Sequence, residues 1–334
     1  MKILVAGGAG YIGSHTCVTL LSAGHELVVV DNFANSEAGV LKKIEKISGV
    51  APKFYKADVR DGGLLQKIFD EFKPEAVVHF AGLKVVGESR ERPLRYYECN
   101  VGGSISLFNV MARNNVKTIV FSSTAAVYGN AKMLPVDETS PVDPLTPYGH
   151  GKAMIERMLA DISAGDPSWR VAALRYFNPV GAHNSGLIGE HHGGTPSNLL
   201  PNIALVADGK LGELKVYGGD FQTPDGTGVR DYIHVVDLAE GHMAALNYLA
   251  KRHKGMVTIN LGTGKGHSVL ETVKVFERVS GKKIPYKIEA RREGDIAESV
   301  ASVSKAKELL GWQTKLGLEE MCRDLWRRQT LNSD

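Results

Sequence analysis

The residues Ile3-Leu4-Val5-Ala6-Gly7-Gly8-Ala9-Gly10-Tyr11-Ile12-Gly13 decide the fold of this chain. The opening apolar run is typical of a buried strand, and the apolar spacing after the glycines predicts a helix. Glycines at 7, 10 and 13 allow a tight turn and let the backbone approach a ligand with no Cβ in the way. The free N–H groups and the positive end of the helix favour an anion. The stretch therefore predicts a site for the pyrophosphate of a dinucleotide.

A carboxylate stands where such a site recognises a ribose. Residues 26–30 predict a second parallel strand, which ends at Asp31, eighteen residues after Gly13. A carboxylate there accepts hydrogen bonds from both ribose hydroxyls of an adenosine and repels a 2′-phosphate, which favours NAD over NADP. Glycines between a strand and a helix can also be turn formers only. The flanking strands and the distance to Asp31 favour the cofactor.

Strand-like and helix-like segments alternate through the first half of the chain. This alternation predicts an α/β fold, a Rossmann-type doubly wound parallel sheet with right-handed crossovers. The expected strands are 53–58, 75–80, 117–122 and 170–175. The expected helices are 37–47, 61–72, 93–114 and 147–164.

The texture of the sequence changes after residue 176. Loops rich in glycine and proline, at 181–196 and 218–228, are of the kind that carries a ligand in a compact enzyme. We therefore expect a NAD-binding domain at 1–175 and a smaller C-terminal lobe, mainly for substrate, at 176–334. For residues 257–261, a place in this lobe and a place in the main sheet both remain open. The elements expected here are helices at 197–208, 235–250, 268–279, 302–310 and 317–329 and strands at 214–217 and 257–261.

Composition and charge exclude several classes of protein. The 334 residues are 43% hydrophobic, enough for a sizeable core, and the formal net charge of +3 comes from no long basic block. We therefore expect no nucleic-acid partner and no membrane partner, and a cytoplasmic location. The three widely spaced cysteines predict neither disulfides nor a zinc site. The histidines 191 and 192 beside Glu190 lack the spacing of metal ligands, so no metal is expected.

Two residues four apart predict acid–base chemistry. Tyr148 and Lys152 follow Thr146 and Pro147, a plausible N-cap and first helical residue, so phenol and ammonium share one helix face. A free tyrosine has a pKa of about 10 and needs a nearby cation to act as a base at neutral pH. Tyr128 and Lys132 show the same spacing, but the sequence after Tyr128 is typical of a turn, so these two side chains need not share a helix face. Behind a dinucleotide fold, we interpret the pair at 148 and 152 as catalytic.

Hydroxyl groups follow the strand expected at 117–122. Ser122, Ser123 and Thr124 stand at the carboxyl edge of the sheet, where ligands of such sheets bind. One hydroxyl can hold a substrate oxygen beside Tyr148 and relay its proton, and we choose Thr124 for this role. Serine and threonine also occur at strand ends as turn formers.

Two other strand ends supply candidate cofactor residues. Asp58 can meet an adenine, although a turn residue explains it almost as well. Small residues in Phe80-Ala81-Gly82 let a cofactor lie across the edge of the sheet. Lys84 follows closely, with an ordinary surface lysine as the alternative.

Several longer motifs carry a family resemblance. They are the glycine turn, Ser122-Ser123-Thr124 before Ala125-Ala126-Val127-Tyr128-Gly129, the Tyr148–Lys152 pair, Arg175-Tyr176-Phe177-Asn178-Pro179 and the segments around 79–84, 226–235 and 291–295. Together they resemble the extended short-chain dehydrogenase/reductase family, and within it the enzymes that epimerise UDP-hexoses at C4. The resemblance runs nearly end to end.

The resemblance implies a reaction that interconverts UDP-glucose and UDP-galactose through a transient 4-keto sugar with tightly bound NAD. Tyr148 would take the proton from the 4-hydroxyl with help from Thr124, while Lys152 would orient the cofactor ribose and lower the tyrosine pKa. The implied cofactor residues are Gly7, Gly10, Tyr11, Ile12, Gly13, Asp31, Asn32, Asp58, Val59, Phe80, Ala81, Gly82, Lys84, Tyr148, Lys152 and Phe177. The implied substrate residues are Lys84, Thr124, Tyr148, Asn178, Asn198, Leu199, Lys215, Val216, Tyr217, Arg230, Arg292, Asp295 and Ser299.

Two arginines are implied as diphosphate ligands, since guanidinium groups suit phosphate oxygens. Taken alone, Arg230 beside Asp231 and Arg292 near Asp295 can equally be solvated ion pairs. The resemblance also implies a homodimer that pairs the helices expected at 93–114 and 147–164.

Three positions depart from the family pattern. Thr124 stands where a serine is common; the hydroxyl remains, but the extra methyl stiffens the rotamer. Cys99 stands where an asparagine is common, which puts one cofactor contact in doubt. Ser299 stands where some members carry a bulky tyrosine beside the sugar, so the resemblance implies that UDP-N-acetylglucosamine and UDP-N-acetylgalactosamine are also accepted.

Two other functions compete with this hypothesis. A nucleotide-sugar 4,6-dehydratase on the same fold needs an added acid and base, which its relatives carry as Asp-Glu after the hydroxyl residue. Here that pair is Ala125-Ala126, which argues against dehydration. A non-catalytic dinucleotide sensor would dispense with the tyrosine and lysine, and both are present.

Overall fold

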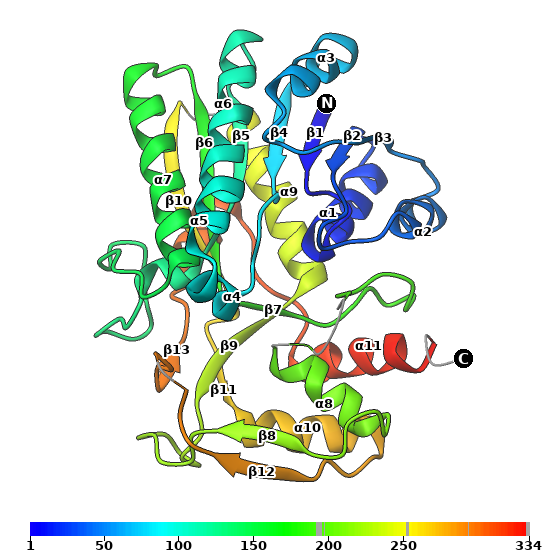
Figure 1. Ribbon diagram of the computed structural model, residues 1–334, viewed down its shortest axis with the longest axis vertical. Coiled ribbons are helices and arrows are strands. Elements are labelled where there is room, and N and C mark those ends of the chain that lie inside the picture. Colours follow the sequence, from blue (N-terminus) through cyan, green and yellow to red (C-terminus); the bar gives the residue numbers. More distant parts are fainter. Residues whose placement is uncertain (192–195, 197, 252–253, 293, 332–334) are drawn as a thin grey trace.

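A parallel seven-stranded sheet forms the centre of the upper part of the molecule in Figure 1. The computed structural model describes residues 1–191, 196, 198–251, 254–292 and 294–331. The strand order is β10-β6-β5-β4-β1-β2-β3, with every neighbouring pair parallel, as predicted. The strands are β1 (Lys2–Ala6), β2 (Glu26–Asp31), β3 (Lys53–Lys56), β4 (Ala76–His79), β5 (Thr118–Thr124), β6 (Arg170–Tyr176) and β10 (Gly255–Leu261).

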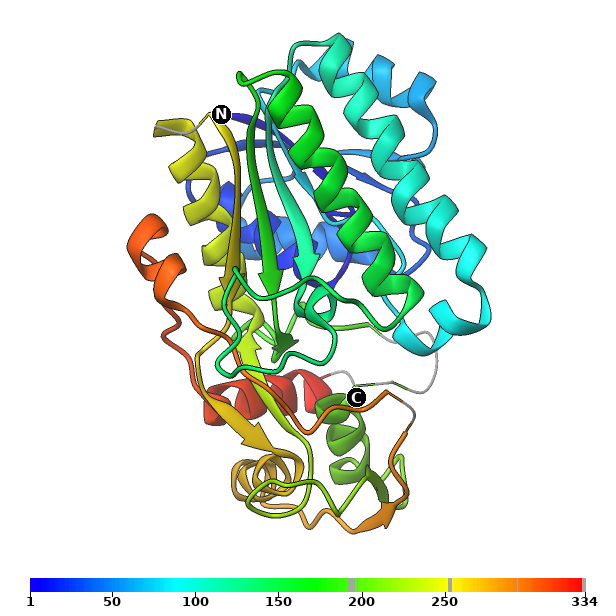
Figure 2. The same ribbon diagram turned by 90° about the vertical axis from the view of Figure 1, so that its left-hand side faces the viewer.

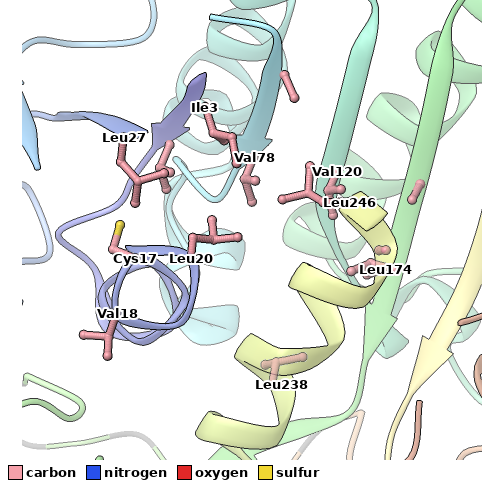
Figure 3. Close-up of a cluster of buried hydrophobic side chains, with 14 of the residues drawn as sticks. Ile3, Cys17, Val18, Leu20, Leu27, Val78, Val120, Leu174, Leu238 and Leu246 are labelled. Atoms are coloured by element: carbon pink, nitrogen blue, oxygen red, sulfur yellow. The ribbon is translucent and has the colours of Figure 1, made fainter. Parts of the chain in front are cut away.

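Helices cover both faces of this sheet because its strands are apolar on both sides. Along β1, Ile3 and Val5 point to one helical layer and Leu4 and Ala6 to the other, as expected from the two-residue period of a strand. Figure 3 shows the first cluster, in which Cys17, Leu20 and Leu238 pack against the strands. That layer is α1 (Tyr11–Ser22), α2 (Gly39–Ser48) and α9 (Val235–Lys251), and the other is α3 (Gly62–Phe72), α6 (Gly103–Arg113) and α7 (Pro147–Gly165).

A smaller lobe, with its own apolar core, lies below the sheet in Figure 1. Its central strand, β9, pairs with three short strands, and a separate two-stranded sheet lies beside it. The elements of this lobe are β7 (Asn178–Val180), α8 (Leu199–Ala207), β8 (Leu214–Tyr217), β9 (Val229–His234), β11 (Gly266–Ser268), α10 (Val269–Ser280), β12 (Tyr286–Glu289), β13 (Glu298–Ser299) and α11 (Leu318–Leu331).

The chain returns from the smaller lobe to pair with the main sheet between β9 and β11, and a later segment, η3 (Ala306–Leu310), packs on α9 and β10. Helix α9 packs on the face of β5 and β6, and β10 then pairs with β6 along its whole length, from Gly255 opposite Arg170 to Leu261 opposite Tyr176. The open question about residues 257–261 is thereby answered in favour of the main sheet.

Two predicted helices differ in the structure. The range 93–114 holds α5 (Pro93–Tyr96), a π-helical segment η1 (Tyr97–Gly102) and then α6. Within the wider segment, the buried Asn100 side chain accepts a hydrogen bond from the Leu83 N–H (2.7 Å) and donates to the Leu83 carbonyl (3.0 Å), which fixes the loop after β4. The helix predicted at 302–310 contains a second π-helical segment, η3 (Ala306–Leu310).

Several short elements escaped prediction. Helix α4 (Val86–Glu91), the 3₁₀ turn η2 (Ala125–Tyr128) and strands β7, β9, β11, β12 and β13 were not predicted, since most are too short to show a periodic pattern. Cys17, Cys99 and Cys322 are free thiols. Among the helices in the described part of the chain, none has the length and apolar character that crossing a bilayer requires.

Candidate active site

The glycine turn between β1 and α1 is packed so closely that side chains do not fit. Gly7 has a φ of +78°, and a Cβ there would lie 2.6 Å from the backbone nitrogen of Ala81. A Cβ on Gly13 would lie 2.3 Å from the carbonyl oxygen of Gly7. The first turn of α1, from Tyr11, therefore presents its N–H groups to an open cavity, as a pyrophosphate requires.

The carboxylate of Asp31 is buried and held in place at the end of β2. One oxygen accepts from the Ala9 N–H (3.0 Å), and the other accepts from the Phe33 N–H (2.9 Å) and from Ser36 Oγ (3.0 Å). The oxygen that accepts from Ala9 has a second lone pair, so the group can still accept a hydrogen bond from a ribose.

The neighbouring strand end at Asp58 is fixed by side chains. Arg60 and Asn32 both donate to Asp58, at 2.9 Å and 3.0 Å. The hydrogen bonds from Arg60 lower the pKa of Asp58 to about 2, so this carboxylate is charged at neutral pH. Asp58 also accepts from the Arg60 N–H (2.9 Å), as a turn residue does, and it lines the cavity described next, so the structure agrees with both interpretations.

The cofactor cavity, as we call the hollow along this sheet edge, has a volume of about 550 Å³. It brings together the predicted cofactor residues from five strand ends, as expected for the carboxyl edge of a doubly wound sheet. They are Gly7, Gly10, Tyr11, Ile12, Gly13, Asp31, Asn32, Asp58, Val59, Phe80, Ala81, Gly82, Lys84, Tyr148, Lys152 and Phe177, and Thr124 and Cys99 line the same cavity.

The three predicted catalytic residues meet at the inner end of this cavity. Thr146 caps α7 by accepting a hydrogen bond from the Gly149 N–H (3.2 Å), with Pro147 at the first position of the helix. Tyr148 on this first turn is hydrogen bonded to Thr124 at the end of β5. One turn later, Lys152 Nζ donates to the carbonyl oxygen of Ser122 (2.7 Å).

Burial controls the ionisation of this group. It lowers the pKa of the Lys152 ammonium to about 8, against the opposing effect of Glu156. It raises the pKa of the Tyr148 phenol, while the hydrogen bond with Thr124 lowers it. Lys152 donates to a backbone carbonyl rather than to the phenol, and its Nζ lies 6.0 Å from the centroid of the Tyr148 ring.

The sequence reasoning missed other groups in the cofactor cavity. Ser122 Oγ is hydrogen bonded to the Tyr176 hydroxyl, and both residues line the cavity beside Lys152. Glu190 pairs with Lys84 (2.6 Å) and lies within reach of Asn198 (3.3 Å). Ser122 and Tyr176 stood beside recognised motif residues, but Glu190 carried no sequence signal, because its partner Lys84 is 106 residues away.

A second hollow of about 630 Å³, the substrate cavity, lies in the smaller lobe. The predicted substrate residues on its walls are Asn178, Asn198, Leu199, Lys215, Val216, Tyr217, Arg230, Arg292 and Asp295. Phe177, Pro179 and Asn198 line both cavities, so the two hollows are adjacent. Ser299 pairs with Arg230 through the strand backbone and is not among the residues that line either hollow.

The two arginines of the substrate cavity are held differently. Arg230 Nη1 donates to the carbonyls of Val229 (2.8 Å) and Ala297 (3.4 Å). Asp231 instead accepts from Thr263, Gly264 and Ala301, so the alternative of an Arg230–Asp231 ion pair is wrong. Burial lowers the pKa of Arg230.

Arg292 does form the ion pair that the sequence left open, with Asp295 at 3.0 Å. Its guanidinium also lies 4.8 Å from the ring centroid of Tyr217, which orients it. Among the described residues, no group of three or more His, Cys, Asp and Glu side chains is placed to hold a metal ion. His192 lies outside the described residues.

Comparison with known proteins gives one family. Residues 3–262 match the NAD dependent epimerase/dehydratase family. A UDP-glucose 4-epimerase of Bacillus subtilis (strain 168) is 54% identical over 99% of this chain and 98% of its own.

Solved structures agree. The chain is 50% identical, with a TM-score of 0.98, to a UDP-glucose-4-epimerase from Stenotrophomonas maltophila with bound NAD and formylated UDP-arabinopyranose; the match covers 100% and 99% of the two chains. It is 48% identical, with a TM-score of 0.96 and the same coverage, to a UDP-glucose 4-epimerase from Bifidobacterium longum in complex with NAD+ and UDP. These matches confirm the resemblance that the motifs indicated. The chain therefore belongs to the NAD-dependent epimerase/dehydratase family.

Proposed function

We propose that this protein interconverts UDP-glucose and UDP-galactose by inverting C4 of the sugar, with NAD as a retained cofactor. One observation carries the proposal: Thr124, Tyr148 and Lys152 lie in the cofactor cavity, which adjoins a cavity containing Arg230 and Arg292. A hydroxyl, a phenol and an ammonium suit alcohol oxidation, and the arginines suit a diphosphate. Full-length relatives named UDP-glucose 4-epimerase, at about half identity, support it.

The residues of the cofactor cavity fit NAD. The tight glycine turn leaves backbone N–H groups for the pyrophosphate, and Asp31 is held where it can accept ribose hydroxyls. When bound, NAD supplies an acceptor for the hydride from C4 of the sugar and later returns that hydride, so the reaction has no net redox change.

Proton transfer falls to Tyr148 and Thr124. As a phenolate, Tyr148 would take the proton of the 4-hydroxyl while Thr124 holds the same oxygen through its own hydroxyl. The same pair would give the proton back after the 4-keto sugar has turned about its diphosphate linkage to present the opposite face. Their hydrogen bond keeps the two oxygens within reach of one substrate atom.

The cation at Lys152 makes the phenolate accessible. With a pKa lowered to about 8, its ammonium is still mostly protonated at neutral pH, and its Nζ lies 6.0 Å from the Tyr148 ring centroid. We propose that Lys152 also holds the cofactor ribose, since its ammonium has further donors beyond the one used on Ser122.

The smaller lobe would hold the nucleotide while the sugar turns. We propose that Arg230 and Arg292 bind the diphosphate, the latter after giving up part of its contact with Asp295. The residues proposed to hold uridine or sugar are Asn178, Asn198, Leu199, Lys215, Val216 and Tyr217, with Lys84 bridging towards the cofactor. Fixing the nucleotide and freeing the hexose permits hydride return on the other face.

The test uses purified protein with UDP-galactose and no added NAD. We expect UDP-glucose to appear by chromatography, and Tyr148→Phe to abolish it. A 4-keto-6-deoxy sugar would instead identify a 4,6-dehydratase. Absence of turnover even after addition of NAD would refute the proposal.

Acceptance of N-acetylated substrates is a further part of the proposal. Ser299 is small, and its strand neighbour Arg230 lines the substrate cavity, which supports room for a 2-acetamido group. The assay is repeated with UDP-N-acetylgalactosamine, with Ser299→Tyr as the variant expected to retain UDP-galactose turnover only. Wild-type protein that leaves the acetamido sugar untouched would refute it.

We also propose that the protein is a cytoplasmic homodimer joined through α5, α6 and α7. These helices run along one outer side of the sheet (Figure 2), and Leu94, Ile105 and Met154 on them are 81%, 45% and 48% exposed. A helix face with such residues favours a helical interface. Light scattering should give twice the mass of one chain, and Leu94→Asp with Ile105→Asp should halve it.

A further inference from the structure

A buried ion pair lies directly behind the catalytic groups. Arg175 Nη2 and Nε donate to Glu156 at 2.5 and 2.9 Å, and both residues are about 95% buried. Ser123 Oγ donates to the same carboxylate, at 2.5 Å. These three residues come from β5, α7 and β6, and none of them lines the cofactor cavity.

Glu156 ties α7 to β5 in the same way as Lys152 does, one helical turn later. Lys152 Nζ is bonded to the carbonyl of Ser122, and Glu156, four residues further along α7, is bonded to Ser123. Two successive turns of one helix are thus tied to two successive residues of one strand. The next strand residue is Thr124, and the preceding turn of the helix carries Tyr148.

The far side of the pair is anchored as well. The Arg175 guanidinium lies 4.8 Å from the centroid of the Tyr128 ring, and the Tyr128 hydroxyl donates to Asn260 Oδ1 (2.7 Å) on β10. Asn260 in turn donates to the carbonyl of Val136 (2.9 Å) and to Glu138 (2.7 Å). The carboxylate is therefore held from both sides and cannot shift without its neighbours.

Stability alone is a weak reason for this arrangement. Removing two charges from water costs about as much as their attraction returns, and an apolar pair of similar size would stabilise the core at least as well. What an apolar pair would not provide is a directed bond to Ser123 and a negative charge near Lys152.

We propose that Glu156, held by Arg175, is a positioning residue: its bond to Ser123 sets α7 against β5 so that Tyr148 and Lys152 face Thr124. The inference rests on the proposed epimerase function and deepens it. Because a displacement of about 1 Å between reacting groups can cost about a hundredfold in rate, a tether beside them acts on turnover more than on binding.

The same carboxylate balances the charge of Lys152. The titratable groups that interact with that ammonium are His79 on β4 and Tyr148 and Glu156 on α7, and Tyr176 on β6 lines the same cavity. Burial lowers the pKa of His79 to about 3 and raises the pKa values of both tyrosines, so none of these three supplies a negative charge at neutral pH before the substrate and cofactor bind. Arg175 is already paired with the carboxylate. Glu156 is thus the negative group that favours a charged Lys152.

The first variant is Ser123→Ala, which cuts the tether and leaves the ion pair intact. We expect kcat for UDP-galactose to fall about tenfold with KM within about twofold and bound NAD and Tm close to wild type. The matched control is Asp161→Asn, which removes an exposed carboxylate from the same helix, paired with Arg157. It should leave kcat and KM unchanged.

The second variant, Glu156→Gln, tests the charge. As pH rises, Lys152 loses its proton and turnover should fall; in Glu156→Gln this fall should begin on the order of one pH unit lower. Asp161→Asn should keep the wild-type profile. If Glu156→Gln does not fold, the KM-against-kcat split of Ser123→Ala decides the matter.

These measurements distinguish failure of the positioning role from failure of the proposed function. An active wild type whose Ser123→Ala variant keeps full kcat, or whose folded Glu156→Gln variant keeps the wild-type kcat and pH profile, overturns the positioning role. A wild type without epimerase activity overturns the proposed function and this inference with it.

Discussion

The cofactor cavity and the substrate cavity are built from the same chain in different ways. The cofactor cavity is lined by residues at successive strand ends, and five of them come from the single segment 7–13. The substrate cavity draws its walls from segments spread between Phe177 and Asp295, and its charged contacts come from long side chains. The cofactor cavity, the cofactor half of the site, is fixed by local geometry. The substrate cavity, the substrate half, depends on the tertiary fold, which brings distant residues together.

The two cavities differ in how much change of their residues they tolerate. A cradle of backbone groups tolerates almost no added volume, as the 2.3 Å approach at Gly13 shows. A wall of side chains can change ligand by exchanging one residue. Substitutions in the two halves should therefore fail in different ways.

The largest effect is expected where the halves meet. Tyr148→Phe keeps the ring but removes the group that accepts the substrate proton, and kcat should fall about 10³-fold or more. Turnover of UDP-galactose is measured together with NAD content and Tm, which should match wild type. A variant retaining a tenth of the wild-type kcat would place the base elsewhere.

The next largest effect is expected in the cofactor half. Gly13→Ala drives a methyl group into the Gly7 carbonyl, so the turn must open; we expect loss of bound NAD and a fall of about 2 kcal/mol in the free energy of unfolding. Gly62→Ala is the matched control, since nothing lies within 4 Å of the added Cβ. Denaturant unfolding and NAD released on heating are the measurements. Equal behaviour of the two variants would contradict the tight cradle.

A moderate effect is expected in the substrate half. Arg230→Gln removes a charge-assisted contact to the diphosphate, worth about 2 kcal/mol, so KM for UDP-galactose should rise about 30-fold. Bound NAD should remain at the wild-type level, because Arg230 does not line the cofactor cavity. Arg323→Gln on α11, an exposed arginine paired with Glu319, is the control. Loss of bound NAD in Arg230→Gln would contradict the conclusion that Arg230 serves the substrate cavity alone.

The smallest effect concerns stability at the catalytic end. The pKa of Lys152 is lowered to about 8 in the folded protein, below its ordinary value of 10.5. Between these values the unfolded chain binds more protons than the folded one, so this group makes the free energy of unfolding rise with pH.

Lys152→Met removes that cost and should be more stable than wild type by about 1 kcal/mol at pH 7, since the Ser122 carbonyl left without its donor offsets part of the gain. The difference should shrink towards pH 10. Urea unfolding at pH 7, 8.5 and 10 measures it, with Arg157→Met, which removes an exposed cation from the same helix, as a control without this trend. A gap that widens with pH would show that the lysine is not destabilised by burial.

The sequence predicts the cofactor half well for a physical reason. Strand, glycine turn, helix and Asp31 are neighbours in the chain, and short-range sterics decide their geometry. The Tyr148–Lys152 pair was also accessible, because one helix sets its spacing. Apolar strand segments that alternate with helical segments predicted the sheet and its parallel order.

The remaining features depend on contacts between distant residues. The Lys84–Glu190 pair, the Ser122–Tyr176 contact and the partners of Asp231 join residues up to 106 apart, and no local pattern signals them. Strand β9 was missed although it is the centre of the smaller lobe, because Arg230 and Asp231 interrupt its apolar run. The π-helical segment at Tyr97–Gly102 likewise reflects the bond between Asn100 and Leu83.

The return of the chain to β10 bears on how such a protein can be divided or recombined. A fragment ending at residue 175 would lack both the strand that pairs with β6 and the helix α9 that covers the face of β5 and β6. It would expose an unpaired strand edge and apolar residues such as Val120 and Leu174, and would be prone to aggregate. Exchange of substrate lobes between relatives therefore cannot use a single crossover, because residues 235–261 and the later segment η3 have to stay with the main sheet.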